Sequence, residues 1–193
     1  MNSFVVADPN KCIGCRTCEI ACVVEHSDND IFTAGNAEIS FNPRLSVIKT
    51  DEVSAPIQCR QCEDAPCANA CPNNALFLKD GAIQVDDNAC VGCKTCVMAC
   101  PFGAIQIVEA YRDGKKVFQN LKQVDGSNLV FKERMTANKC DLCANSQEGP
   151  ACERVCPTQA FRIVKETELK QSIKDKRKQS ANEIVWAMSK RES

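Results

Sequence analysis

The 16 Cys residues of this 193-residue chain constrain its fold more than any other feature, because they form four sets of four with none left over. Within each set the spacing is short and regular, as it is when several thiolates bind one metal centre. In chain order the sets are Cys12-x2-Cys15-x2-Cys18-x3-Cys22, Cys59-x2-Cys62-x4-Cys67-x3-Cys71, Cys90-x2-Cys93-x2-Cys96-x3-Cys100 and Cys140-x2-Cys143-x8-Cys152-x3-Cys156. We name them the first, second, third and fourth motifs.

The cellular compartment decides between metal-bound thiolates and disulfides. The N-terminal residues lack the basic region and apolar stretch of a signal peptide, and no apolar run is long enough to cross a membrane. We therefore expect a cytoplasmic protein without direct membrane insertion. Because the cytosol keeps thiols reduced, metal binding is favoured over disulfides.

The rest of the composition narrows the chemistry. A formal net charge of −1 argues against a protein that binds nucleic acid. His26 is the only His, which argues against His-based metal sites and catalytic triads, so we predict no catalytic residue. Aromatic residues make up 5% of the chain, so something other than large side chains must fill the interior.

The first and third motifs have the spacing by which bacterial ferredoxins bind [4Fe–4S] clusters. Gly14 and Gly92 stand where such a loop must turn closely around the cluster and aim N–H groups at sulfur. Zinc bound by paired Cys-x2-Cys units is the alternative, but zinc has no use for the third Cys of this spacing. The motifs therefore predict iron–sulfur clusters.

Pro follows the last Cys of the second, third and fourth motifs, whereas Val23 follows Cys22. We expect each fourth Cys to start a short helix that points toward a neighbouring cluster. The Pro would then lie in the first helical turn, where its missing N–H is tolerated. Val23 keeps the spacing and is expected to change little. Three residues after each Pro comes an Ala with an apolar neighbour, in Ala75-Leu76, Ala104-Ile105 and Ala160-Phe161.

The motifs repeat in the order A-B-A-B, because the second and fourth share a stretched gap with Pro66 or Pro150 before the third Cys. Both adjacent and nested pairing would join an A motif to a B motif. The 18 residues between the second and third motifs resemble one compact hairpin with Asp80-Gly81 at its turn, while the other gaps hold 36 and 39 residues. We therefore predict that the second and third motifs form an inner module and that the first and fourth close over it.

In a two-cluster ferredoxin the fourth Cys of each motif binds the other cluster. Nested pairing then predicts four [4Fe–4S] sites, with iron as the only metal and Cys as the only ligand. Site 1 is Cys12, Cys15, Cys18 and Cys156; site 2 is Cys22, Cys140, Cys143 and Cys152; site 3 is Cys59, Cys62, Cys67 and Cys100; site 4 is Cys71, Cys90, Cys93 and Cys96.

Short strands and short helices alternate, which predicts an α+β fold of two nested bacterial ferredoxin-like modules and a C-terminal helix. The outer module takes residues 1–58 and 101–164, the inner module takes residues 59–100, and the tail takes residues 165–193. Strands are expected at 44–49, at 75–79 with 82–85, and at 104–111 with 117–121 around a turn at 112–114, followed by a loop at 125–128.

The tail contains no Cys, and from Thr167 to about residue 190 it has no Gly or Pro, which predicts a helix capped by Thr167. Two interpretations stay open. The helix folds back on the body, or it serves docking or self-assembly through its apolar residues. Those residues are Leu169, Ile173, Ile184, Trp186 and Met188.

The whole pattern resembles the four-cluster iron–sulfur subunits that accompany molybdopterin oxidoreductases. The segments FVVADPNKCIGCRTCEIACVVEH, CRQCEDAPCANACPNNA, CVGCKTCVMACPFGA and KCDLC with GPACERVCPTQA are closest to the electron-transfer subunits of formate hydrogenlyase and hydrogen-dependent carbon dioxide reductase. The resemblance covers residues 1 to about 164.

The resemblance implies a non-catalytic subunit of anaerobic metabolism that carries single electrons between a molybdenum or tungsten formate dehydrogenase and a hydrogenase. Its implied partners are those two enzymes and other ferredoxin-like subunits. Two alternatives remain. One is the iron–sulfur subunit of a dimethyl sulfoxide or polysulfide reductase, and the other is an iron–sulfur assembly or maturation factor.

Overall fold

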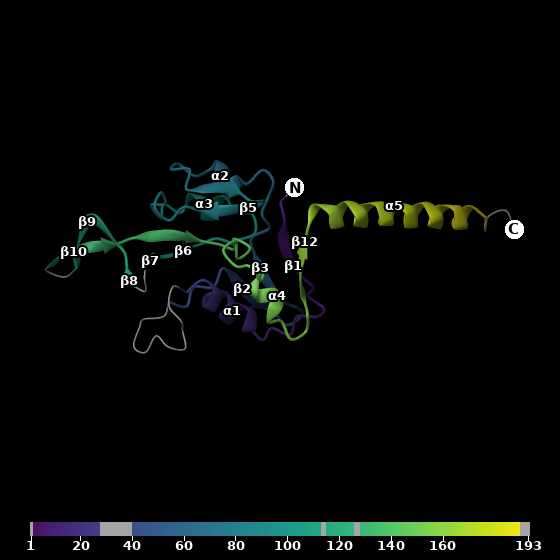
Figure 1. Ribbon diagram of the computed structural model, residues 1–193, viewed down its shortest axis with the longest axis horizontal. Coiled ribbons are helices and arrows are strands. Elements are labelled where there is room, and N and C mark those ends of the chain that lie inside the picture. Colours follow the sequence, from purple (N-terminus) through teal and green to yellow (C-terminus); the bar gives the residue numbers. More distant parts are fainter. Residues whose placement is uncertain (1, 28–39, 113–114, 126–127, 190–193) are drawn as a thin grey trace.

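The computed structural model describes residues 2–27, 40–112, 115–125 and 128–189 (Figure 1). Within these ranges the chain forms five helices and six two-stranded antiparallel sheets. The helices are α1 (Thr17–Glu25), α2 (Pro66–Asn69), α3 (Thr95–Ala99), α4 (Ala151–Arg154) and α5 (Glu166–Ser189). The strands are β1 (Phe4–Ala7), β2 (Leu45–Lys49), β3 (Ser54–Gln58), β4 (Leu76–Lys79), β5 (Ala82–Val85), β6 (Gln106–Glu109), β7 (Tyr111–Arg112), β8 (Lys115–Lys116), β9 (Phe118–Asp125), β10 (Asn128–Glu133), β11 (Met135–Asn138) and β12 (Phe161–Val164). The predicted α+β class and C-terminal helix are confirmed.

The two ends of the Cys region lie side by side. β1 pairs with β12, and α1 packs on α4. β2, which was predicted at 44–49, pairs with β3. One buried cluster contains Val5, Leu45, Val47 and Phe161 together with Cys18, Cys22 and Cys152. The segments that carry the first and fourth motifs therefore share one hydrophobic core.

A second core joins the second and third motifs. β4 pairs with β5, and the turn residues Asp80 and Gly81 have positive φ angles of 52° and 75°, as a tight hairpin turn requires. The predicted hairpin is therefore confirmed. α2 packs against α3 beside it. This buried cluster contains Ala65, Ala75, Leu76, Ile83, Ile105 and Ala137 with Cys67, Cys90 and Cys96.

The prediction for the segment between the third and fourth motifs is wrong in its pairing. β6 pairs with β11 rather than with residues 117–121. β7 and β8 form a two-residue ribbon around the predicted turn, of which residues 113–114 lie outside the described ranges. β9 pairs with β10 across the predicted loop, whose residues 126–127 are not described. β10 contains an apolar run and is closer to β9 in the sequence than β6 is. β9 and β10 therefore form a hairpin, which extends from the body (Figure 1).

The expectation that each fourth Cys starts a helix is also wrong. α2, α3 and α4 are single turns that end before the fourth Cys of their motifs. Each covers most of the three residues that separate the third Cys from the fourth. Cys100 has an extended backbone (ψ 113°), which is the conformation that a following Pro imposes. Pro thus ends the helix instead of beginning one. Cys22, which Val23 follows, lies inside α1.

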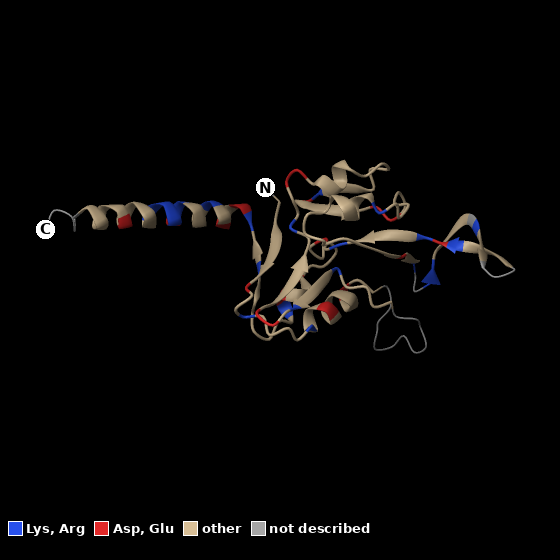
Figure 2. Cartoon of the chain, turned by 180° about the vertical axis from the view of Figure 1, so that it is seen from behind, with Lys and Arg blue, Asp and Glu red and all other residues tan. Residues whose placement is uncertain are grey.

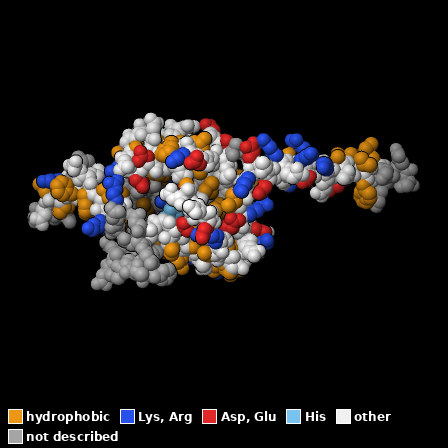
Figure 3. Space-filling model, viewed as in Figure 1, with side chains coloured by type: hydrophobic (Ala, Val, Ile, Leu, Met, Phe, Trp, Pro, Cys, Tyr) orange, Lys and Arg blue, Asp and Glu red, His pale blue; other side chains and the backbone are white. Residues whose placement is uncertain are grey.

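α5 extends away from the body in both views (Figures 1 and 2), so the interpretation that it folds back on the body is wrong. It begins at Glu166, one residue before the predicted cap. Charged residues of both signs follow its length, and apolar atoms gather near its C-terminal end (Figures 2 and 3). Among the described residues, no helix is both long and apolar enough to span a membrane.

Candidate iron–sulfur sites

The four Cys of site 1 line a single cavity, which forms where the loop of the first motif meets the end of the fourth. Val47 and Phe161 line the same cavity. The four Cys of site 4 also line one cavity, together with Leu76 and Ile107. In both cavities, three Cys of one motif face the last Cys of another motif.

The thiols of site 2 interact through their charges. Burial raises the pKa of Cys152, and the charges of Cys140, Cys143 and Cys22 raise it further. Burial likewise raises the pKa of Cys143 to about 11, with further contributions from Asp141 and Cys22. Thiols at this depth carry their protons until a metal displaces them, since a bound cation ionises the thiols that coordinate it.

Site 3 shows the same pattern. Burial raises the pKa of Cys67 to about 11, and the charges of Cys59 and Cys100 add to the rise. Burial and the charges of Cys59 and Cys100 also raise the pKa of Cys62. The charges of the thiols within site 2 and within site 3 therefore act on one another.

The backbone amide of the Ala that follows each Cys-Pro pair faces a sulfur atom. The N–H of Ala75 donates to Cys71 Sγ at 3.3 Å, that of Ala160 to Cys156 Sγ at 3.3 Å, and that of Ala104 to Cys100 Sγ at 3.5 Å. Such bonds stabilise negative charge on sulfur. Four thiols per site, apolar walls and N–H donors aimed at sulfur fit a [4Fe–4S] cluster.

Comparison with known proteins agrees with this chemistry. Models of the 4Fe-4S binding domain match residues 9–23 and 83–106, around the first and third motifs. The chain is 46% identical over 182 residues to electron transport protein HydN of Escherichia coli, covering 94% of this chain and 98% of HydN. The chain belongs to the HydN family of electron transport proteins. It is also 40% identical to formate hydrogenlyase subunit 2 (94% and 91% covered) and 39% identical to hydrogenase-4 component A (94% and 92% covered), both of Escherichia coli.

Two Cys of this electron transport protein are exposed at equivalent positions of the repeat, Cys15 and Cys93. A hydrogen bond from the Thr17 hydroxyl lowers the pKa of Cys15, and one from Thr95 lowers that of Cys93. Gly92 before Cys93 has a φ of +65°, and a Cβ there would lie 2.6 Å from Met135 Cβ, so only Gly fits. Sites 1 and 4 therefore each present one ligand to solvent.

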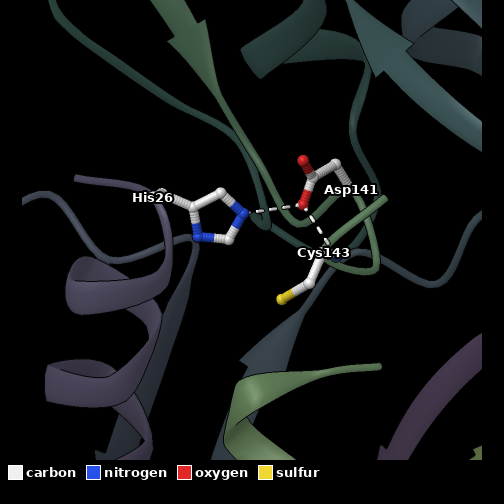
Figure 4. A group of neighbouring side chains, drawn as sticks. All are labelled: His26, Asp141 and Cys143. Atoms are coloured by element: carbon white, nitrogen blue, oxygen red, sulfur yellow. Dashed lines mark hydrogen bonds and ion pairs between the residues drawn. The ribbon is translucent and has the colours of Figure 1, made fainter. Parts of the chain in front are cut away.

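Cys22 has surroundings unlike those of any other fourth Cys. Its Sγ accepts a hydrogen bond from the N–H of Arg44 at 3.2 Å, and His26 Nδ1 lies 3.7 Å away. His26 Nε2 contacts Asp141 Oδ1 at 3.0 Å, and the same Oδ1 accepts the N–H of Cys143 (Figure 4). Arg44 Nη1 donates to the other oxygen of Asp141 at 2.6 Å. This network ties the first motif to the fourth.

The electrostatics of this network favour two charged partners. Burial opposes the ionisation of Asp141, but the hydrogen bond with His26 and the charge of Arg44 outweigh it and hold its pKa well below the usual range. Burial lowers the pKa of His26, yet its hydrogen bonds with Asp141 and Cys22 raise it to about 9. The sequence predicts His26, which follows the first motif closely, as a residue at the surface or beside the ligands. Arg44 and Asp141 were missed, since only the folded chain brings them together.

Two further residues that the sequence did not single out are Gln61 and Lys139, whose side chains are both 2% exposed. Gln61 Nε2 donates to the Cys140 carbonyl at 2.8 Å, and Gln61 Oε1 accepts the N–H of Ile83 at 2.8 Å. Lys139 Nζ donates to the Cys140 carbonyl at 2.7 Å. They join the second motif, β5 and the fourth motif. A Lys directly before a Cys was the only local signal.

Proposed function

We propose that this chain is a non-catalytic subunit that relays single electrons through four [4Fe–4S] clusters between a formate dehydrogenase and a hydrogenase in a cytoplasmic complex. The observation that carries the proposal is the convergence of the Cys into separate sites, two of which are cavities lined by four Cys. The similarity to HydN, formate hydrogenlyase subunit 2 and hydrogenase-4 component A supports the choice of partners.

The proposed ligands are the 16 Cys in the four sets defined as sites 1 to 4. The cavities of sites 1 and 4 support the crossing of the fourth Cys between motifs. The mutual effects of the thiols on pKa support the same crossing at sites 2 and 3. When bound, a [4Fe–4S] cluster supplies one-electron redox chemistry at a potential that depends on hydrogen bonds and solvent access.

We propose the nested modules as well, with residues 1–58 and 101–164 forming the outer module, residues 59–100 the inner module and residues 165–193 the tail. Two separate buried cores support this division. The pairing of β1 with β12 supports the closing of the outer module by its two ends. One departure is that Ile105 and Ala137, from the outer segment, lie in the inner core.

The proposed order of the sites along the electron path is 1, 2, 3, 4. The charge of Cys18 in site 1 acts on Cys152 in site 2, and the charge of Cys59 in site 3 acts on Cys140 in site 2. Site 3 and site 4 share the inner core. The exposed Cys15 and Cys93 then lie at the two ends of the path, where partner enzymes exchange electrons.

The groups of this chain assist electron transfer between the clusters but carry out no reaction themselves. Amide N–H groups stabilise the added charge on sulfur, and buried apolar side chains keep water from sites 2 and 3. Outside the Cys, the candidate acid–base group is His26, and it is bound to Asp141. This supports a carrier in which catalysis takes place in partner subunits.

The ligand map is tested by paired substitutions in anaerobically purified protein. Cys22→Ala and Cys152→Ala belong to one proposed site, so the double variant should perturb one cluster, as each single variant does. Cys12→Ala with Cys22→Ala, taken from the same motif, should perturb two. Iron content and electron paramagnetic resonance of partially reduced protein measure both. If the Cys12 and Cys22 pair perturbs only one cluster, the crossing is wrong. If no cluster is reducible, the relay itself is wrong.

We also propose that α5 serves docking or self-assembly. Ile184, Trp186 and Met188 are 61%, 62% and 64% exposed near its end, and Ile173 and Leu169 continue toward its start. Deleting residues 167–193 should reduce the size of the complex without changing its iron content. Ile184→Lys/Met188→Lys should act like the deletion, and Thr167→Lys/Gln171→Lys, at the exposed start of the helix, is the matched control. Unchanged size by size-exclusion chromatography would contradict the proposal.

A further inference from the structure

Lys139 is a buried cation between β5 and the fourth motif. Its side chain is 2% exposed, and Nζ donates hydrogen bonds to the carbonyls of Ile83 and Cys140. Its ammonium forms no ion pair with a carboxylate anywhere in the part of the chain that the structure describes. A buried ammonium is costly unless a negative charge compensates it. Carbonyl dipoles satisfy its hydrogens but do not neutralise its charge.

Lys139 lies beside ligands of sites 2 and 3. It precedes Cys140 and shares the Cys140 carbonyl with Gln61, whose backbone N–H donates to Cys59 Sγ at 3.4 Å. Burial raises the pKa of Cys140 to about 12, and the charge of Lys139 opposes that rise. The same charge opposes the rise of the Cys67 pKa. One ammonium therefore acts on a ligand of each of the two central sites, between which the electron must pass.

The position of Lys139 is fixed from several sides. Gln61, equally buried, donates to the Cys140 carbonyl and accepts the N–H of Ile83, so it spans the same two residues that Lys139 contacts. Asn138, which precedes Lys139, donates to the carbonyls of Asn42 and Pro43 at 3.1 Å. A charge held in this way cannot move toward solvent.

We propose that Lys139 is a positioning residue whose fixed charge stabilises the reduced clusters at both central sites. The inference rests on the proposed function and adds to it a group that sets the energy of the middle step. Reduction adds negative charge to a cluster, and a cation in a low-dielectric interior favours that state more than one in water does. Lys94, beside Cys93 of site 4, is exposed and gives the contrasting case.

The test is a redox titration of the full-length holoprotein, followed by electron paramagnetic resonance. Lys139→Gln removes the charge but keeps a donor for the two carbonyls. It should lower the midpoints of two clusters so that their reduction is at least tenfold less favourable, which corresponds to about 59 mV for one electron. Lys139→Arg should restore both midpoints. Lys94→Gln should change the equilibrium constant of cluster reduction by less than about twofold, because solvent and salt screen its charge.

Three results would overturn the proposal. They are wild-type midpoints in Lys139→Gln, an equal shift of all four clusters, and an equal shift in Lys94→Gln. A purely structural role predicts loss of iron in Lys139→Gln without a shift in the clusters that remain. If the wild-type protein contains four reducible clusters and only the shift is absent, the role of Lys139 fails and the electron relay stands. If the wild-type protein contains no reducible cluster, both fail.

Discussion

Cys22 and the other three fourth Cys share one spacing but have different backbones. Cys71, Cys100 and Cys156 follow the end of a single-turn helix, and each Sγ accepts the amide N–H of the Ala four residues later. Cys22 lies within the nine-residue helix α1, and its Sγ accepts the N–H of Arg44 instead. The position of a ligand in the sequence thus fixes which metal it binds but not which donors surround it.

The difference has a structural consequence beyond Cys22. Because no Pro ends α1, the helix continues to Glu25 and brings His26 to Asp141, 115 residues away in the sequence. The three Cys-Pro motifs make no such contact; each turns at once toward its next strand. We conclude that Val23 permits the contact between His26 and Asp141 that joins the first motif to the fourth. The sequence had suggested that Val in place of Pro changes little.

The largest effect is expected when this difference is removed by Val23→Pro, which makes the first motif match the others. Pro within a helix lacks the N–H that bonds to residue 19 and its ring clashes with the preceding turn, at a cost of about 3 kcal/mol or more. We expect loss of iron from sites 1 and 2 and a lower thermal midpoint, measured on anaerobically purified protein. Wild-type iron content and midpoint would show that the continued helix is not needed.

A smaller effect is expected from Asp141→Ala, which keeps α1 but removes its partner in the fourth motif. It leaves Arg44 and His26 without their shared carboxylate in a site whose side chains are largely buried. The expected loss is about 2–3 kcal/mol in the free energy of unfolding. The control is Glu148→Ala, whose exposed carboxylate pairs with Arg154 and should contribute less than about 1 kcal/mol. Equal losses of stability in the two variants would contradict the special role of Asp141 between the two motifs.

These residues also show how much the sequence could predict. The Cys motifs, the β4–β5 hairpin and the C-terminal helix follow from local patterns, since spacing, a turn pair and the absence of Gly and Pro act over a few residues. The contact of His26 with Asp141 and the burial of Lys139 depend on chain segments that meet only after folding. Nothing near Lys139 distinguishes it from Lys11, which also stands between an Asn and a Cys but is exposed.

The prediction of the strand pairing was wrong for a related reason. Residues 104–111 and 117–121 both have the composition of strands and lie close enough to pair, so the sequence favours the nearest partner. The folded chain instead pairs β6 with β11, which also places Met135 against Gly92 of the third motif. The packing against site 4 outweighs the advantage of the shorter loop, because loop closure costs rise only slowly with length.

His26→Leu should have a moderate effect that is confined to site 2. It removes the hydrogen bonds of His26 with Asp141 and with Cys22, while Arg44 still pairs with Asp141. We expect a loss of about 1–2 kcal/mol in stability and a lower midpoint for the cluster at site 2, since a donor near its sulfur is lost. His26→Gln, which can still reach Asp141, should retain most of the stability. A midpoint shift at site 4 instead would contradict the assignment of Cys22.

The smallest effect is expected from the reverse exchange, Pro101→Ala, which makes the third motif resemble the first. The extended backbone of Cys100, which Pro101 favours, is also held by the N–H of Ala104, which donates to Cys100 Sγ, and by the turn at Gly103 (φ +61°). Pro mainly restricts the unfolded chain, so its loss should cost less than about 1 kcal/mol. Thermal unfolding and the cluster signal of site 3 measure this. If Pro101→Ala were as damaging as Val23→Pro, the Cys-Pro pair itself would hold the ligand, and the amide of Ala104 would be secondary.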